Sequence, residues 1–259
     1  MDDVYRHQPG VQEVDAMSVS VPRAETVTPT EPVDGTPLIP PLQEGDRLTR
    51  DEFERRYDAM PHLKKAELIE GVVHVPSPVR QRRHSAPHSS LVGWLFLYRA
   101  RTPGVELGDN PSVRLDLGNM PQPDAVLFVQ PESRGQVKID ADDYINGAPD
   151  LVAEVSASSE SYDLHEKLQA YQRNGVREYL VWRVLKRQVD WFVLHEGGYE
   201  RLAPAEDGTL RSTVFPGLCL DPAALIRGDV NAVYAVVQHG LSSPEHTDFV
   251  TRLERARGA

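Results

Sequence analysis

The segment from Gly147 to Tyr171, with the sequence GAPDLVAEVSASSESYDLHEKLQAY, constrains the fold more than any other part of the chain. Its first half is a turn followed by an apolar run from Leu151 to Val155, which predicts a buried strand that contains one carboxylate, Glu154. Its second half has helical spacing, and Lys167 lies on the apolar stripe of that predicted helix. Charged groups are costly in buried positions, so this pairing of a strand carboxylate with a helix lysine indicates a site.

A third ionisable group, Asp124, is expected near the same buried region. It stands at the head of a nearly continuous apolar run, Ala125 to Val129, which is typical of a central strand buried on both faces. Paired carboxylates on adjacent strands can hold Mg²⁺, which lowers the pKa of a bound water, and a nearby lysine can stabilise developing charge. Asp124, Glu154 and Lys167 are therefore the residue types that phosphodiester hydrolysis requires.

Composition limits the class of protein. The chain has 259 residues, enough for one good-sized domain with extensions or for two small domains. Its single cysteine, Cys219, cannot form an intramolecular disulfide, so we expect a cytoplasmic location. No apolar run is long enough for a membrane helix, and the acidic start of the chain does not resemble a secretory signal, so no membrane partner is expected.

Charge is distributed unevenly along the chain. The net charge is −11, and residues 1–45 hold eight acidic residues against two arginines in a Pro-rich segment without apolar periodicity. The remaining negative charge argues against a surface coated with DNA-binding charge but is compatible with a local basic cleft. We expect a disordered acidic tail at residues 1–45, an α/β domain at residues 46–226 and a helical C-terminal extension at residues 227–259.

Local signals predict the elements of the α/β domain. Thr49 and Glu52 match a capping box at the start of a short helix, and Ser158 or Ser159 is expected to cap the helix that carries Lys167. A second helix is predicted at residues 84–101. Extended runs are predicted at residues 105–108, 112–117, 125–129, 151–155, 178–183, 189–194 and 199–202.

Basic residues before the predicted helix at 84–101 are candidates for substrate binding. Arg80, Arg82 and Arg83 lie within four residues and could grip a phosphate backbone, although a solvated charged loop is an equal alternative. His84 and His88 have the spacing of one helix face, but no third metal ligand is evident, so we interpret them as residues that approach a substrate phosphate.

Four motifs together resemble the Uma-two family of restriction-endonuclease-like proteins, which belongs to the PD-(D/E)XK nuclease superfamily. They are ELIEG at 67–71, QPDAVLFV at 122–129, GAPDLVAEVSASS at 147–159 and YDLHEKLQAYQRNGVREYLV at 162–181. The resemblance spans about residues 48–225. It implies a restriction-endonuclease-like α/β fold, with a mixed central sheet flanked by helices, and a site for Mg²⁺ or Mn²⁺.

The family's site residues carry over position by position. The resemblance implies that Asp124 and Glu154 bind the metal, that Lys167 is the catalytic lysine moved from strand to helix, and that Glu67 is a weaker site member. The chain departs from the pattern at Arg183, where family members often have an aspartate. The usual E-X-K motif of the superfamily is also absent, because Glu154 is followed by Val155 and Ser156. Lys167 must therefore act as the catalytic lysine.

These observations predict a magnesium-dependent endonuclease that acts on DNA. Two other classes stay open: a non-catalytic module with a nuclease fold that binds nucleic acid or protein, and a metal-dependent hydrolase of small phosphate esters. Glu154 and Lys167 could instead form a buried structural ion pair, and Asp163 is expected to interact with the helix dipole. A homodimer is compatible with cutting both DNA strands, but no interface is legible in the sequence.

Overall fold

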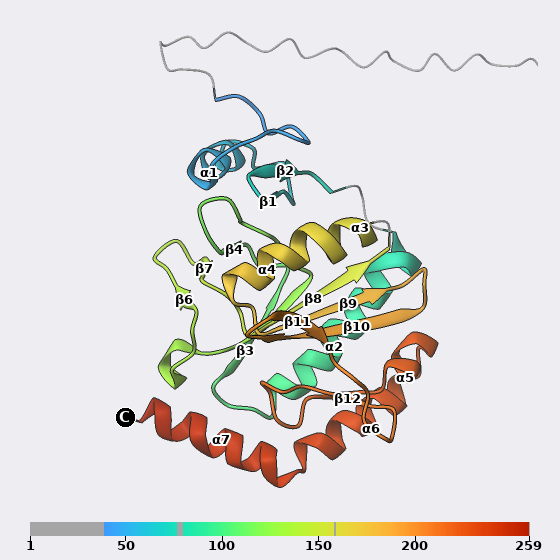
Figure 1. Cartoon of the computed structure of the whole chain (residues 1–259). Helices are drawn as coiled ribbons and strands as arrows, with labels where there is room; N and C mark the ends of the chain where they lie inside the picture. The colour runs from blue at the N-terminus through green and yellow to red at the C-terminus, as the bar shows by residue number, and fades with distance from the viewer. Residues whose placement is uncertain (1–38, 77–79, 158, 259) are drawn as a thin grey trace, which may run out of the picture. The chain divides into compact units, whose positions relative to one another are not determined.

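The computed structural model describes residues 39–76, 80–157 and 159–258. Most of the predicted acidic tail, residues 1–38, therefore lies outside the described residues, as does the candidate cap Ser158. The centre of the domain is a six-stranded sheet in the order β11-β10-β9-β8-β5-β3 (Figure 1). Its strands are β3 (Val105–Asp109), β5 (Ala125–Val129), β8 (Leu151–Ser156), β9 (Glu178–Arg183), β10 (Gln188–His195) and β11 (Gly198–Arg201).

The sheet is mixed, because β8 and β9 run parallel while the other neighbouring strands are antiparallel. Helices cover both faces, and Figure 1 shows α2 on one face and α4 on the other. The fold class is therefore α/β with a mixed central sheet flanked by helices, as expected from the resemblance. No helix within the described ranges combines the length and the apolar character that a membrane crossing requires.

The pairing register of β5 and β8 positions the candidate site. Ala125 pairs with Ala153 in antiparallel fashion, so Asp124 stands opposite Glu154. Side chains alternate between the faces of a sheet, and Val126 and Val152 pack with Tyr171 of α4 in one core cluster. Asp124 and Glu154 share this alternation, so both carboxylates point toward the face that α4 covers.

The helix that carries Lys167 is built from three short pieces. They are α3 (Glu160–Tyr162), the π-helical turn η3 (Asp163–Lys167) and α4 (Leu168–Asn174). Gly175 ends α4 in the left-handed conformation, as predicted. The prediction that Ser159 caps this helix is wrong, because its hydroxyl donates to Asp163 Oδ2 instead of accepting from a backbone amide.

The opposite face of the sheet carries most of the hydrophobic core. The helix α2 (Ala86–Arg99) contributes Leu91, Trp94 and Leu95 to this core, and a π-helical turn, η1 (Gln81–Ser85), precedes it. The helix therefore begins about three residues before the predicted start at 84. Three C-terminal helices join the same core: α5 (Pro222–Arg227), α6 (Val230–Leu241) and α7 (Pro244–Arg257).

The N-terminal part of the described chain forms a small layer of its own. It contains α1 (Arg50–Asp58) and the hairpin of β1 (Glu67–Ile69) and β2 (Val72–His74). The capping box predicted at Thr49 does not form, because Glu52 binds Arg55 and Arg56.

The remaining short elements lie between or after the main strands. The strand predicted at 112–117 is reduced to β4, because only Val113 and Arg114 of that segment pair with β7. The short elements are β4 (Val113–Arg114), η2 (Pro131–Ser133), β6 (Lys138–Ile139), β7 (Ile145–Asn146), β12 (Leu210–Arg211) and β13 (Cys219–Leu220).

Candidate active site

A buried lysine holds carboxylates from three separate segments. Lys167 Nζ lies 2.8 Å from Glu154 Oε1, 2.9 Å from Glu67 Oε1 and 3.9 Å from Asp163 Oδ1. All four side chains are buried. The structure therefore brings together Glu67, Glu154 and Lys167, which the sequence predicted as site residues, and adds Asp163.

Local geometry explains this convergence. Asp163 and Lys167 are four residues apart in the π-helical turn and so share one face of it. Glu67 begins β1, and its Oε1 also accepts a hydrogen bond of 2.8 Å from the Gln122 backbone amide. The carboxylate of Glu67 thus ties the β1–β2 hairpin to the segment that leads into Asp124.

Asp124 has two oxygens in different environments. Its Oδ2 accepts a hydrogen bond of 2.8 Å from the Val155 backbone amide and lies 3.2 Å from His84 Nε2. Its Oδ1 is buried and has no hydrogen-bond partner among the described residues; Lys65 Nζ lies 3.6 Å away. Glu154 Oε2 lies beside the backbone of Asp124 and accepts a long hydrogen bond of 3.4 Å from the Asp124 amide.

Charges around the two carboxylates shift their pKa values in opposite directions. Burial raises the pKa of Asp124, but His84 and Lys65 outweigh burial and bring it to about 2. Burial raises the pKa of Glu154 to about 8, because Lys167 does not offset both burial and the neighbouring carboxylates. Asp124 therefore ionises more readily than Glu154.

Lys167 is held in its charged form. Burial lowers its pKa, but Glu154, Glu67 and Asp163 outweigh burial and raise it well above the usual range. Tyr171 donates a hydrogen bond of 3.1 Å to Glu154 Oε1. One oxygen of Glu154 is thus fixed by Lys167 and Tyr171, and the other is left toward Asp124.

The donor set suits a hard divalent cation. Carboxylate oxygens are the ligands that Mg²⁺ and Mn²⁺ prefer, and Asp124 Oδ1 is a buried oxygen that lacks a hydrogen bond. Within the described parts of the chain, no three His, Cys, Asp or Glu side chains are already gathered around one ion-sized position. The residues fit the implied cation as two protein ligands, a number that Mg²⁺ commonly accepts when water completes its shell.

The predicted substrate-binding residues divide into two groups. His84 and His88 both reach the site, because His88 Nε2 lies 3.0 Å from the backbone oxygen of Asp124. Arg80, Arg82 and Arg83 are exposed beside them at the start of η1 and point no charge into the buried cluster. Their predicted role is still a prediction.

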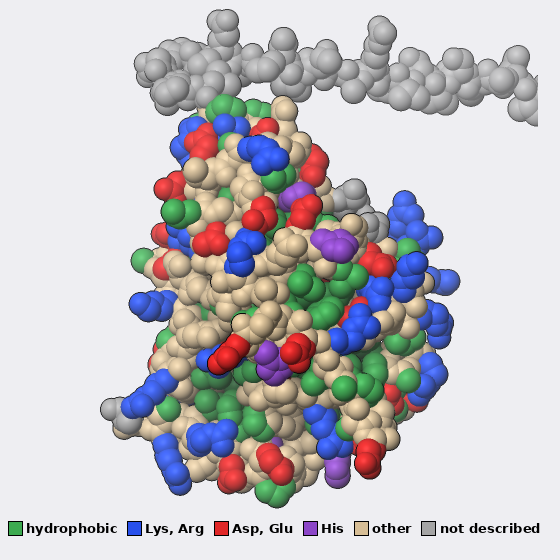
Figure 2. Space-filling view, viewed as in Figure 1, with side chains coloured by type: hydrophobic (Ala, Val, Ile, Leu, Met, Phe, Trp, Pro, Cys, Tyr) green, Lys and Arg blue, Asp and Glu red, His purple; other side chains and the backbone are tan. Residues whose placement is uncertain are grey.

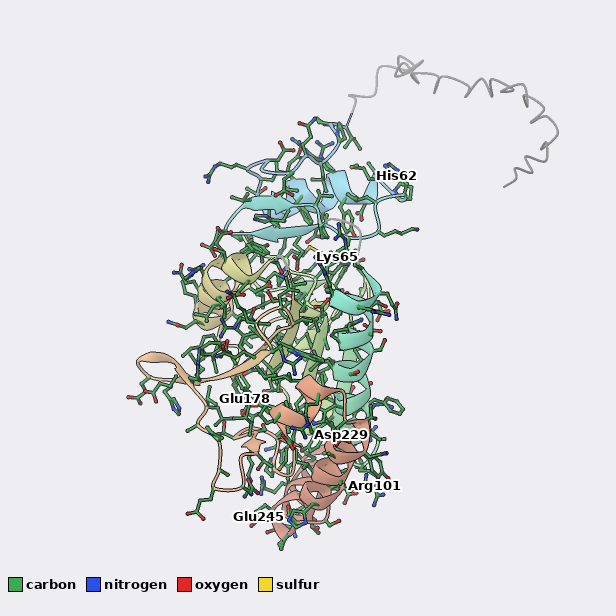
Figure 3. All side chains as sticks on the ribbon, turned by 90° about the vertical axis from the view of Figure 1, so that its right-hand side faces the viewer. His62, Lys65, Arg101, Glu178, Asp229 and Glu245 are labelled. Carbon is green, nitrogen blue, oxygen red and sulfur yellow. The ribbon has the colours of Figure 1, made fainter. Side chains whose placement is uncertain are left out.

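Two site neighbours were missed by the sequence reading. Lys65 lies two residues before Glu67, so in an extended segment both side chains share a side, and this spacing was the available signal. Asp163 was assigned to the helix dipole, but its spacing of four from Lys167 placed it on the same face. Figure 3 shows Lys65 between the β1–β2 hairpin and the start of α2.

The chain is similar to a known protein family and to a solved structure. The family Uma2, described as "Putative restriction endonuclease", matches residues 50–223. A solved structure described as a "putative nuclease belonging to DUF820" from Anabaena variabilis ATCC 29413 shares 16% identity with a TM-score of 0.48, covering 69% of this chain and 99% of that chain. The comparison with curated proteins found no match. Because the family match spans well over half of the 259 residues, the chain belongs to the Uma2 family.

Proposed function

We propose that this protein is a metal-dependent endonuclease that hydrolyses phosphodiester bonds in DNA. One observation carries the proposal: a buried, ionised Asp124 with one open oxygen stands opposite a Glu154 that Lys167 holds in place. The family assignment supports the same reaction class.

Each charged side chain has a distinct role in this proposal. Asp124 and Glu154 would hold Mg²⁺ or Mn²⁺, which when bound polarises the phosphoryl oxygen and acidifies a water. Lys167 fixes Glu154 and places a positive charge beside the position where the attacking water would lie. Glu67 keeps Lys167 in place through its contact of 2.9 Å.

The surface near the site can accept a nucleic acid in spite of the net charge of −11. Figure 2 shows Lys and Arg side chains gathered along the edge where Figure 1 places the start of α2 and the ends of β8 and β9. Arg80, Arg82 and Arg83 are exposed at the start of η1, and His84 of the same turn contacts Asp124. We assign these arginines to the phosphates that flank the scissile bond.

The first test is cleavage of supercoiled plasmid and of single-stranded DNA by the purified protein. The reactions contain Mg²⁺, Mn²⁺ or EDTA, and Asp124→Ala is the matched variant. We expect nicking that needs the metal and is lost in the variant, together with a rise in wild-type melting temperature on adding metal.

Other outcomes would redirect the assignment. Stabilisation by metal with turnover only of a small phosphodiester would favour a hydrolase of small phosphate esters. If the protein does not cleave and is not stabilised by metal, the result favours a non-catalytic module with a nuclease fold. Full cleavage by Asp124→Ala would overturn the proposed site.

A further inference from the structure

A second lysine lies at the candidate site and has no role in the proposed chemistry. Lys65 Nζ is 3.6 Å from Asp124 Oδ1 and 3.4 Å from Asn110 Oδ1. Asp124 Oδ1 is the oxygen that accepts no hydrogen bond from any described residue. Lys65 is therefore the cation that stands at the open oxygen of the site, at a distance too long for a hydrogen bond.

The two lysines of the site differ in how firmly they are held. Lys167 is almost completely buried and contacts three carboxylates, whereas the side chain of Lys65 is 27% exposed and, among the acidic residues that the structure describes, contacts only Asp124. The lysine side chain is a flexible stem with a compact charge at its end. Lys65 can therefore leave Asp124 without unfolding its surroundings, and Lys167 cannot.

Asp124 Oδ1 is also the oxygen that a divalent cation would take. Its partner Oδ2 is already engaged by the Val155 amide and His84. A cation at Oδ1 would repel the ammonium of Lys65 and would compete with it for the same negative charge. Lys65 also lies toward the outside of the buried cluster, where a bound DNA strand would approach.

We propose that Lys65 is a place-holding cation that occupies Asp124 Oδ1 before a divalent cation binds and then turns to a substrate phosphate. The inference rests on the proposed function, because it needs both a metal at Asp124 and a phosphate beside it. In the absence of metal, Lys65 offsets part of the charge of a buried carboxylate. In its presence, Lys65 becomes a substrate-positioning residue.

The proposal makes two predictions of opposite sign for Lys65→Ala. Divalent-ion affinity should rise because a competing cation is removed; a partly exposed pair of this kind is worth up to about 1 kcal/mol, which is about a two- to fivefold tighter Kd for Mn²⁺. Affinity for DNA should fall, with KM raised and kcat little changed, because a contact present in both the ground state and the transition state is lost. Removing a lysine with a merely structural role would not strengthen metal binding.

The experiment compares Lys65→Ala, Lys65→Arg and Lys64→Ala with the wild type. Lys64 is the adjacent exposed lysine, so Lys64→Ala removes the same charge from the same segment. Mn²⁺ affinity is measured by calorimetric titration without DNA, and steady-state cleavage supplies KM and kcat. Duplex affinity is measured by fluorescence anisotropy in Ca²⁺. We expect both effects in Lys65→Ala alone, and recovery of KM in Lys65→Arg.

The outcomes separate this inference from the proposed function. Unchanged or weaker Mn²⁺ binding in Lys65→Ala, or unchanged DNA affinity, overturns the role of Lys65 while leaving a cleaving wild type assigned. A wild type that binds Mn²⁺ and DNA but cleaves nothing overturns the nuclease, and the two affinities still decide Lys65. A wild type without Mn²⁺ binding overturns both.

Discussion

Two buried carboxylates on adjacent strands of the sheet, Glu154 in β8 and Glu178 in β9, are held in different ways. Glu178 accepts hydrogen bonds from four neutral donors: the Thr213 amide at 2.6 Å, the Thr213 hydroxyl at 2.8 Å, the Ser212 hydroxyl at 2.7 Å and the Val214 amide at 3.2 Å. Glu154 has a cation, one hydroxyl and a single long amide contact.

The difference separates a structural carboxylate from a candidate functional one. Both oxygens of Glu178 accept hydrogen bonds from one loop, three at Oε1 and one from the Ser212 hydroxyl at Oε2, so this side chain anchors the loop to β9. In the cluster around Lys167, Glu154 Oε2 accepts one long hydrogen bond of 3.4 Å from the Asp124 amide, and Asp124 Oδ1 has no hydrogen-bond partner among the described residues. Figure 3 shows Glu178 farther from the β1–β2 hairpin than Lys65 is.

The largest expected effect comes from removing the cation of the first cluster. Lys167→Met leaves buried carboxylates without a counter-charge, and breaking such a pair costs about 3–5 kcal/mol of the free energy of unfolding. Cleavage should also be lost. Glu178→Gln keeps the neutral donors largely satisfied and should change stability by less than about 1 kcal/mol. Urea denaturation of both variants in EDTA, with plasmid cleavage, measures the contrast.

Equal destabilisation by the two substitutions would mean that both clusters are structural. Loss of Lys167 is expected to affect the fold as well as cleavage, because this lysine is buried among Glu67, Glu154 and Asp163. Asp124→Ala is for this reason the cleaner test of catalysis.

The pattern of apolar residues was sufficient to predict most strands of the central sheet. The apolar run Leu151–Val155 and the run Ala125–Val129 are β8 and β5 within one residue, because a strand buried on both faces leaves a continuous apolar signal. The stripe that places Lys167 toward the sheet was likewise legible. The π-helical turn at Asp163–Lys167 was not, since one wide turn hardly changes a helical pattern.

Contacts between distant segments could not be predicted from local pattern. Lys65 and His84 reach Asp124 from separate segments, and only the folded chain decides which cation does so. The capping box failed because arginines at 55 and 56 compete for Glu52. Arg183, which departs from the family pattern, pairs with Glu160 at 2.9 Å and with Asp190 at 2.7 Å. The sequence motifs did not indicate these two ion pairs.

An effect of intermediate size is expected in the pH dependence of stability, to which the carboxylates Glu178 and Asp124 contribute with opposite sign. Burial raises the pKa of Glu178 above 4.5, so its folded form binds more protons, and stability falls as pH rises from 4.5 through the folded value. The pKa of Asp124 is about 2 in spite of burial, because His84 and Lys65 favour the ionised form. Its stabilisation of about 2 kcal/mol is present above pH 3.8 and is lost as pH falls toward 2.

Variants of Asp124 and Glu178 test which residue causes each of these two changes of stability with pH. In EDTA, Asp124→Asn should be less stable than the wild type at pH 6, and the difference should shrink as the pH approaches 2. Glu178→Gln should gain stability relative to the wild type as pH rises above 4.5. Chemical denaturation at stepped pH gives both differences, and parallel profiles for the two variants would remove the distinction between the carboxylates.

The smallest expected effect isolates one hydroxyl in each cluster. Tyr171→Phe removes the donor at 3.1 Å from Glu154, and Thr213→Val removes the hydroxyl donor at 2.8 Å from Glu178, with little change of shape in either case. Each should cost about 1 kcal/mol of the free energy of unfolding. Only Tyr171→Phe should also slow cleavage, by about fivefold, because a Glu154 held by Lys167 alone can rotate away from Asp124. If Thr213→Val slows cleavage equally, the saturated carboxylate and the open one belong to one coupled unit, and saturation does not distinguish structure from function in this sheet.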